Sequence, residues 1–468
     1  MASAFHIENF GCRAARADGE AVGDRLRAGG LSEGQPATAD VVIVNTCSVT
    51  AEADRAARAY IRRTHRLNPE ARIMVTGCYA QRAPEELGGL DGVAAVVGNS
   101  HKALAPEIAA GLARGAALPP AVTGHGLVPL ASVTSSGGTP IWADDRFAHS
   151  FLEEAQVLPG VQTRPNLKIQ EGCGNRCTFC IIPQTRGSSR SLATEAVMRQ
   201  VNGFVAAGGN ELVLSGINLG RWGRDLPRES GIPGSLAELV RRIFSDTGLA
   251  RLRLSSIEPM DWDAELIGLM REFGGSRLAR HAHLPLQSGS DAVLRRMHRR
   301  YRPWHYAAKL AALVDAAGPE LTLGADVMVG FPGESDREFE ETLEFIRALP
   351  FGYLHLFPFS PRPGTRGWTL HAESPVPAKV SEERMTILRV LAEEKTRWHR
   401  ARMIGRTLEA ITLRTSESQA WDGNTGALAE NFIPLRVEGR HEANRLLRIQ
   451  ATGLTEDALL AARILTLH

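Results

Sequence analysis

The six cysteines of this 468-residue chain are the residues best suited to carry chemistry. Three of them, Cys173, Cys177 and Cys180, are spaced as CxxxCxxC directly after a strand-like run, and thiolates this close together favour a bound metal. A structural zinc site usually needs four ligands, but this loop contains no further cysteine and no histidine. The spacing suits three irons of a [4Fe–4S] cluster, which leaves the fourth iron open for chemistry. A zinc loop is the alternative.

The other three cysteines are far apart in the sequence but share one local setting. Cys12, Cys47 and Cys78 each directly follow a predicted strand. The carboxyl ends of parallel strands lie at the same edge of a sheet, so we expect these three thiols to converge. Three buried structural cysteines are the alternative. Disulfides are not expected, because cytoplasmic thiols stay reduced and a core of this size needs no covalent crosslinks.

The elements that must position these cysteines alternate between strand-like and helix-like runs, which indicates an α/β fold. Residues 1–113 predict an open parallel-sheet domain, and residues 114–160, rich in Gly, Ser, Thr and Pro, predict a linker. Residues 161–400 contain six strand–helix units, typical of a partial (β/α)6 barrel whose active site lies at the carboxyl ends of the strands. Residues 401–468 predict a small all-β barrel.

Four loops of the central region combine glycine with polar residues. One precedes the second strand, and the others end the third, fourth and fifth strands. Taken singly, each loop is more simply explained as a turn, but their repetition favours cofactor binding, because glycine permits a close approach of the backbone. The expected contacts are Gly208, Gly209, Glu211, Ser255, Glu258, Gln287, Ser288 and Asp326.

The composition is that of an ordinary globular protein, with 43% hydrophobic and 23% charged residues. The 54 Lys and Arg nearly balance the 52 Asp and Glu, so the net charge gives no general signal for nucleic acid or membrane. No apolar run is long enough to span a bilayer, and the N-terminus lacks the basic flank and apolar core of a signal peptide. We expect a cytoplasmic protein that does not bind a membrane.

The loop Cys173–Cys180, with the strand–helix units behind it, resembles the radical S-adenosylmethionine (SAM) enzymes. In that family the open iron binds the amino and carboxylate groups of SAM, and an electron from the cluster cleaves SAM to methionine and a 5′-deoxyadenosyl radical. The resemblance therefore implies a [4Fe–4S] cluster and SAM as cofactors. It also implies that Gly208–Glu211 corresponds to a Gly-Gly-Glu-type segment that contacts the methionine moiety.

The settings of the first three cysteines resemble the N-terminal domain of the methylthiotransferases. The matching runs are Asn9–Cys12, Asn45–Thr50 and Thr76–Gln81. In that family these cysteines hold a second [4Fe–4S] cluster, which supplies the sulfur. Glu430–Val437 looks like part of the family's small RNA-binding β domain, the TRAM-like domain. The resemblance covers the whole chain and implies two clusters, one to make the radical and one to deliver the sulfur.

Three substrates occur in that family: the tRNA adenosine beside the anticodon with an isopentenyl group, the same adenosine with a threonylcarbamoyl group, and an aspartate of a ribosomal protein. Cys47–Arg58 and Asn68–Ala71 look most like the threonylcarbamoyl subgroup. The resemblance implies a methylthio transfer to C2 of N6-threonylcarbamoyladenosine at position 37, with tRNA and an unidentified electron donor as partners. The other two substrates are the alternatives.

Three basic runs predict contacts to RNA phosphates, although each could equally be a solvated surface. They are Arg55, Arg58, Arg62 and Arg66; Arg295, Arg296, His298, Arg299 and Arg300; and Arg397, His399, Arg400, Arg402 and Arg406. Two other functions also remain open at this point. One is a radical enzyme of a different reaction type in which the first three cysteines are structural, and the other is a non-catalytic RNA-binding zinc protein.

Overall fold

The computed structural model describes residues 3–120, 122–123, 126–127, 138–145, 147, 163–227, 233–414, 423–456 and 459–467. Backbone contacts divide the chain into two units. The first, here called the cysteine unit, comprises Met1–Gln156, Gln170–Arg190 and Ser360–Thr365. The second, here called the barrel unit, comprises Val157–Ile169, Ser191–Phe359 and Arg366–His468. All six cysteines therefore belong to the cysteine unit.

The cysteine unit is built on a sheet with the strand order β2-β1-β3-β4-β5-β8-β6-β7. Its centre consists of the parallel strands β1 (Ala4–Asn9), β3 (Val41–Thr46), β4 (Arg72–Gly77) and β5 (Val93–Gly98). These segments are rich in Val, Ile and Ala, as expected for strands that are buried on both faces. The predicted open parallel sheet is confirmed.

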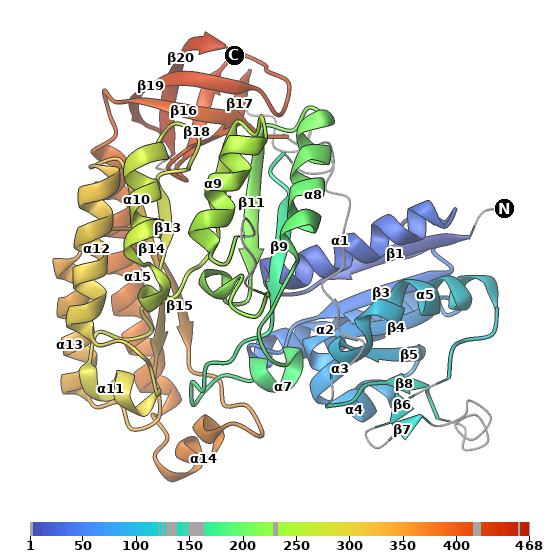
Figure 1. The fold of residues 1–468 in the computed structure, drawn as a ribbon. Coiled ribbons are helices and arrows are strands. Elements are labelled where there is room, and N and C mark those ends of the chain that lie inside the picture. Colours follow the sequence, from blue (N-terminus) through green and yellow to red (C-terminus); the bar gives the residue numbers. More distant parts are fainter. Residues whose placement is uncertain are drawn as a thin grey trace. The chain divides into compact units, whose positions relative to one another are not determined.

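Helices cover both faces of this sheet (Figure 1). Val41 faces the core formed with α1 (Arg13–Ala28) and α5 (Ala105–Arg114), whereas the next residue, Val42, faces the core formed with α2 (Ala51–Leu67). This alternation follows from the two-residue period of a strand and explains why β3 and β5 lack polar residues until their carboxyl ends.

The central strands end at the same level. Asn45 pairs with Asn9 on one side and with Thr76 on the other, and each of these residues lies within two or three positions of a cysteine. The register therefore places the three loops that carry cysteines at one edge. The remaining elements of the unit are β2 (Ser32–Glu33), α3 (Cys78–Arg82), α4 (Pro84–Gly88), η1 (Asn99–Leu104), β6 (Val122–Thr123), β7 (Gly126–Leu127), β8 (Ile141–Trp142) and α7 (Ile182–Arg186).

Most of the expected linker, residues 114–160, lies outside the described residues. Within its described part the structure differs from the expectation, because β8 pairs with β5 and extends the sheet. Trp142 of β8 is fully buried in the core and donates a hydrogen bond from Nε1 to the carbonyl oxygen of Pro120 at 2.9 Å. A two-residue strand in a segment rich in Gly and Ser has no periodicity by which the sequence could reveal it.

The barrel unit contains the strands that end at the second set of candidate residues. β11 (Glu211–Gly216) and β12 (Arg251–Leu254) form a sheet with β9 (Asn166–Glu171) and β10 (Arg190–Ser191), in the order β10-β9-β11-β12. A second sheet has the order β13-β14-β15. Leu252 of β12 joins the two sheets, because it accepts from Ala279 at 3.0 Å and donates to Arg277 at 2.8 Å.

Helices alternate with these strands, as the sequence predicts for a partial barrel (Figure 1). Ser235 and Ser335 each begin a helix with a complete capping box, a pattern that satisfies backbone donors at the helix start. The other strands of the barrel are β13 (His281–His283), β14 (Thr322–Val329) and β15 (Phe351–Pro358). The helices are α8 (Thr194–Ala206), η2 (Leu219–Arg221), α9 (Leu236–Asp246), η3 (Pro259–Asp261), α10 (Ala264–Phe273), α11 (Asp291–Arg296), α12 (Pro303–Ala317), α13 (Asp336–Ala348), α14 (Arg366–Glu373) and α15 (Ala378–Ala401).

The predicted C-terminal all-β barrel is also confirmed. Its strands are β16 (Thr407–Thr412), β17 (Asn424–Ala429), β18 (Pro434–Glu438), β19 (Leu446–Leu454) and β20 (Leu460–Leu467), and they close in the order β16-β17-β18-β20-β19. The apolar residues of these strands form a core of their own. Across the described part of the chain, every helix is too short or too polar to cross a membrane.

Candidate functional site

The first three cysteines lie together at the carboxyl edge of the sheet in the cysteine unit. Cys12 is the N-cap residue of α1, Cys47 follows β3, and Cys78 begins α3. Gly11 has φ +103°, and a Cβ atom at this position would lie 2.7 Å from Cys47 Sγ. Glycine therefore allows the backbone beside Cys12 to approach Cys47. Cys47 and Cys78 are buried, whereas Cys12 is exposed.

The three thiols are close enough to affect one another electrostatically. Burial, together with the charges of Cys78 and Cys12, raises the pKa of Cys47 to about 12. At neutral pH the Cys47 thiol therefore keeps its proton unless a cation replaces it, and iron bound between the sulfurs would offset both the repulsion and the desolvation cost. The donor set therefore fits a [4Fe–4S] cluster with three cysteine ligands.

A fully buried arginine contacts the sulfur of Cys78. Arg186, at the end of α7, donates from Nε to Cys78 Sγ at 3.2 Å and forms ion pairs from Nη1 with Glu171 at 2.7 Å and Asp18 at 3.0 Å. Asn99 adds a second donor to the same sulfur at 3.4 Å. Hydrogen bonds to a sulfur ligand tune an iron–sulfur cluster, so these residues have the chemistry of outer ligands to a cluster.

The loop Cys173–Cys180 is held open by backbone contacts. The amide of Cys173 donates to the carbonyl of Gly187 at 3.1 Å, and the amide of Cys180 donates to that of Cys177 at 3.1 Å. Asn175 donates its backbone N–H to Cys173 Sγ at 3.4 Å. The three cysteines are half-buried, which fits a cluster that must also receive a ligand from outside the loop.

The barrel unit brings together some of the predicted cofactor contacts at the carboxyl side of its strands. Ser255 follows β12, and Gln287 follows β13 and bonds through its backbone to β14. Among the described residues, Ser255 Oγ and Gln287 Oε1 are buried without a hydrogen-bond partner. Glu258 and Ser288, in contrast, are engaged: Glu258 pairs with Arg299 at 2.5 Å, and Ser288 shares a hydrogen bond of 2.9 Å with Thr342. A buried polar atom without a protein partner can be satisfied by water or by a bound ligand, so these two oxygens are available for ligand contact.

Gly208, Gly209 and Glu211, the other predicted contacts, lie at the amino end of β11. Both oxygens of the buried Glu211 carboxylate form ion pairs, one with Arg253 at 3.0 Å and the other with Arg251 at 3.5 Å. Burial opposes the ionisation of Glu211, but the arginines outweigh it and lower its pKa. Glu211 therefore belongs to a buried ion-pair group at the amino end of β11, whereas Ser255 and Gln287 follow the carboxyl ends of β12 and β13.

Ser215 occupies the carboxyl end of β11. Its Oγ is buried and has no hydrogen-bond partner within the described ranges. Sequence reasoning missed Ser215, although the run Leu-Ser-Gly at the end of an apolar strand is the same signal that identified Ser255.

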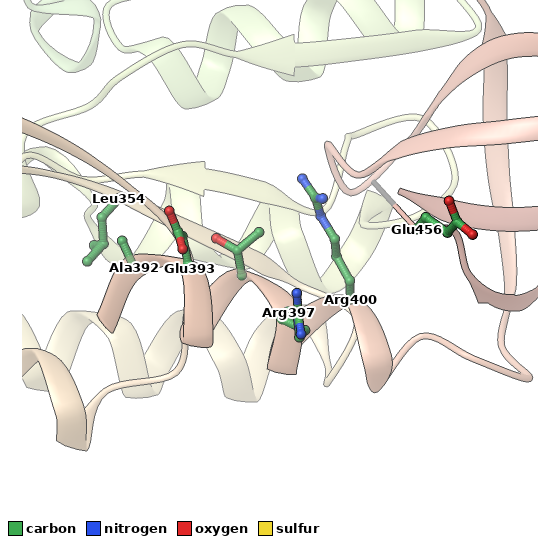
Figure 2. Close-up of a pocket in the computed structure, with 7 residues that line it drawn as sticks. Leu354, Ala392, Glu393, Arg397, Arg400 and Glu456 are labelled. Atoms are coloured by element: carbon green, nitrogen blue, oxygen red, sulfur yellow. The ribbon is translucent and has the colours of Figure 1, made fainter. Parts of the chain in front are cut away.

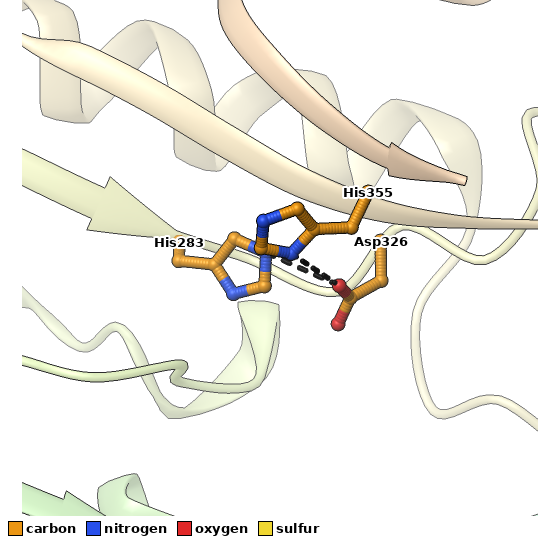
Figure 3. A group of neighbouring side chains, drawn as sticks. All are labelled: His283, Asp326 and His355. Atoms are coloured by element: carbon orange, nitrogen blue, oxygen red, sulfur yellow. Dashed lines mark hydrogen bonds and ion pairs between the residues drawn. The ribbon is translucent and has the colours of Figure 1, made fainter. Parts of the chain in front are cut away.

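His283, Asp326 and His355 form a compact group on β13, β14 and β15 (Figure 3). Both imidazoles point at one oxygen of Asp326, with His283 Nε2 and His355 Nδ1 each 3.3 Å from Oδ1. Burial opposes the ionisation of Asp326, but its hydrogen bonds with the two histidines hold the pKa of this carboxyl well below its usual range. Only Asp326 of this group was expected from the sequence, because the histidines join it through strand register.

Comparison with known families and proteins agrees with this arrangement. Residues 4–98 match the family described as Uncharacterized protein family UPF0004, and residues 167–346 match the Radical SAM superfamily. The chain is 36% identical to the threonylcarbamoyladenosine tRNA methylthiotransferase MtaB of Bacillus subtilis, over 94% of this chain and 91% of that protein. The chain belongs to the radical SAM methylthiotransferases.

A second relative of this methylthiotransferase carries a different name. The chain is 34% identical to the tRNA-2-methylthio-N(6)-dimethylallyladenosine synthase of Sorangium cellulosum, over 94% of this chain and 86% of that protein. Among solved structures, the radical SAM methyltransferase TsrM of Kitasatospora setae superposes with a TM-score of 0.53 at 15% identity and covers 80% of this chain and 78% of its own. That likeness concerns the fold alone. As a radical SAM enzyme, this methylthiotransferase uses SAM and a [4Fe–4S] cluster.

The basic runs of the methylthiotransferase are only partly available for RNA. On α2, Arg62 and Arg66 are exposed, whereas Arg58 is paired with Glu86 at 3.0 Å. In the second run Arg299 is buried against Glu258, and Arg295 is paired with Asp291 at 2.8 Å; Arg296 is likewise paired with Glu338 at 2.8 Å. Arg299 is therefore not available to phosphate, whereas Arg295 stays 61% exposed in its surface pair.

The third run contributes two arginines to an open pocket of about 510 Å³ (Figure 2). Arg397 and Arg400 line this pocket beside Glu393 and Glu456. His399, which sequence reasoning grouped with them, is buried and forms a hydrogen bond of 2.7 Å with Thr322. The mixed charge of the pocket gives no clear preference for phosphate, so this region supports RNA binding only weakly.

Proposed function

We propose that this methylthiotransferase transfers a methylthio group to C2 of N6-threonylcarbamoyladenosine at position 37 of tRNA, beside the anticodon. The observation that carries the proposal is the presence of two separate three-cysteine sets in one chain, each with the donor chemistry of a cluster site. The relative from Bacillus subtilis is named for this reaction. Dimethylallyladenosine is the second candidate substrate, because the relative from Sorangium cellulosum is named for it and is 34% identical to this chain.

The two cysteine sets are assigned to different tasks. Cys173, Cys177 and Cys180 would hold the cluster of the radical SAM superfamily, and the remaining set, Cys12, Cys47 and Cys78, would hold a second [4Fe–4S] cluster. When bound, the clusters supply an electron for SAM cleavage and an iron site that carries sulfur. A separate electron donor would reduce the enzyme.

The chain's own residues would orient and tune these groups. Arg186 and Asn99 donate hydrogen bonds to Cys78 Sγ, which stabilises negative charge on that sulfur. The backbone N–H of Asn175 does the same for Cys173 Sγ. Exclusion of water from Cys47 and Cys78 by burial would strengthen these interactions.

Five residues of the barrel remain candidates for contact with SAM. Ser255 and Gln287 are supported best, because each has a buried oxygen without a partner among the described residues. Glu258 and Ser288 would act by holding loops in place, since their side chains already have protein partners. Asp326 already contacts two histidines, so these partners can stabilise its negative charge without a direct contact with SAM.

The proposed division of the chain follows from these tasks. Residues 1–113 would form the domain of the second cluster, 114–160 the linker, 161–400 the radical SAM core and 401–468 the TRAM-like domain that binds tRNA. The closed five-strand barrel between Thr407 and Leu467 is the kind of small β domain that presents strands and loops to RNA.

Mass spectrometry of nucleosides from total tRNA tests the substrate. A strain without the gene should lose the methylthio group on threonylcarbamoyladenosine and regain it when the wild-type gene is restored. A Cys47→Ala gene should fail to restore it. A Lys379→Ala gene, which changes an exposed residue in the first turn of α15, should restore it and serves as the control for expression from the same vector. Loss of the methylthio group from isopentenyladenosine instead would favour the second candidate substrate.

A further inference from the structure

His283, Asp326 and His355 belong to three neighbouring parallel strands. Asp326 of β14 is paired in register with His355 of β15, and His283 of β13 is paired with Gly324, two residues before Asp326. The exposed fraction of the side chain rises from 9% at His283 to 25% at Asp326 and 62% at His355. A ligand can therefore reach this group at His355. Asp326 and His283, which are less exposed, hold the His355 ring in place (Figure 3).

Aromatic rings close the group on its buried side. The ring of His283 stacks on Tyr353 with a centroid distance of 5.9 Å, and Tyr353 packs against Phe432 at 5.6 Å. The hydroxyl of Tyr353 is held by His281 Nε2 at 2.8 Å. This packing fixes the ring of His283, so the group has one accessible end and one rigid end.

The charge on Asp326 determines what His355 presents. An ionised carboxylate only accepts hydrogen bonds, so His355 Nδ1, which forms a hydrogen bond of 3.3 Å with Asp326, is the donor of that pair. A neutral His355 then has its acceptor at Nε2, on the far side of a largely exposed ring. If His355 gains a second proton, the same position becomes a cationic donor. In either state it offers a polar partner and disfavours an apolar neighbour.

The two candidate substrates differ in this respect. A threonylcarbamoyl group carries N–H donors, carbonyl oxygens, a hydroxyl and a carboxylate, whereas a dimethylallyl group has only C–H bonds. A substrate that covers the His355 ring displaces water from it, so a polar substituent restores the lost hydrogen bond, whereas an apolar substituent leaves the ring nitrogen unsatisfied. We propose that His355, positioned by Asp326 and His283, binds the polar N6 substituent of the substrate adenosine and selects it over an apolar one. This inference rests on the proposed function.

The test uses the full chain loaded with its clusters and two anticodon stem-loops that differ only in the N6 substituent, threonylcarbamoyl or isopentenyl. The measurement is kcat/KM for methylthio formation on each RNA. His355→Phe keeps the ring but removes its polar atoms, and His355→Asn keeps a polar side chain. The matched control is His305→Phe, a change of an exposed histidine on α12 that lies outside the group. Iron content and SAM cleavage without RNA show whether each variant is correctly folded.

The expected result is a loss of about 10- to 100-fold in kcat/KM for the threonylcarbamoyl RNA in His355→Phe, with no loss for the isopentenyl RNA. His355→Asn should lose less, and His305→Phe should match the wild type. An equal loss on both RNAs, or no change on either, would overturn the proposal. A bound zinc ion would also overturn it: if the wild type held one zinc per chain in addition to its cluster iron, and His355→Phe lost that zinc, the imidazoles would bind a metal and not the substrate. Failure of the proposed function looks different, since the wild-type enzyme itself would then not methylthiolate the threonylcarbamoyl RNA.

Discussion

At the scale of single residues, Arg186 lies close in sequence to one cysteine set and contacts a sulfur of the other. It lies six residues after Cys180, yet its Nε contacts Cys78 Sγ at 3.2 Å. Removing a positive donor from a sulfur ligand favours the oxidised cluster, so we predict that Arg186→Gln lowers the reduction potential of the cluster at Cys78 by on the order of 60 mV, about 1.4 kcal/mol for one electron. Redox titration monitored by electron paramagnetic resonance measures this change.

Two further variants separate the tuning of the cluster from a loss of structure. Arg186→Lys keeps the positive charge near Glu171 and should recover part of the shift in potential. Gln184→Ala, a change of an exposed residue on the same short helix, should leave the potential unchanged. If Arg186→Gln had full iron content and an unaltered potential, Arg186 would have only a packing role.

Cys47 gives a second prediction at this scale, because burial and the nearby thiols raise its pKa to about 12. The thiolate is the reactive form, and at pH 8 it is only a very small fraction of a thiol whose pKa is about 12. In the protein without clusters, Cys47 should therefore react with iodoacetamide at pH 8 much more slowly than the exposed Cys12. Mass spectrometry of peptides after timed alkylation measures the two rates. The rates should become equal in denaturant, and equal rates in the folded protein would contradict the burial of Cys47.

The contact between α15 and β14 gives a prediction at the scale of elements. His399 is buried against Thr322, and burial, with a smaller contribution from Arg402 and Arg400, lowers the pKa of His399 to about 4. The unfolded chain binds this proton near pH 6.5, so between pH 6.5 and pH 4 the unfolded state holds more protons than the folded state. Stability therefore falls as the pH decreases, by about 2 kcal/mol between pH 7 and pH 5.

Urea unfolding of the full chain, monitored by circular dichroism at pH 7 and at pH 5, measures this loss of stability. His399→Gln cannot take up the proton, so its unfolding midpoint should depend less on pH than that of the wild type. His305→Gln, an exposed histidine on α12, should keep the full dependence. The role assigned to His399 would be refuted by an identical pH dependence in His399→Gln and the wild type.

Features that repeat along the chain could be read from the sequence, whereas those that depend on register could not. The strands before Cys12, Cys47 and Cys78 were predictable because apolar runs and helical runs alternate at regular spacing. Ser215 and β8 were missed, because a single serine and a two-residue strand have no period. Arg186 and His355 reach their partners across 108 and 29 residues, a distance at which single-sequence patterns carry no information.

At the scale of the whole molecule, the proposal requires two clusters that can be lost independently. The fully loaded chain should contain about eight irons, and either Cys47→Ala or Cys173→Ala should reduce this to about four. Cys173→Ala should abolish the cleavage of SAM, because its cluster would no longer supply the electron. Cys47→Ala should still cleave SAM but transfer no sulfur, since its sulfur-carrying site would be absent. Iron analysis and the yield of 5′-deoxyadenosine measure the two activities separately. Loss of SAM cleavage in Cys47→Ala with four irons still bound would show that the two cysteine sets do not divide the chemistry in this way.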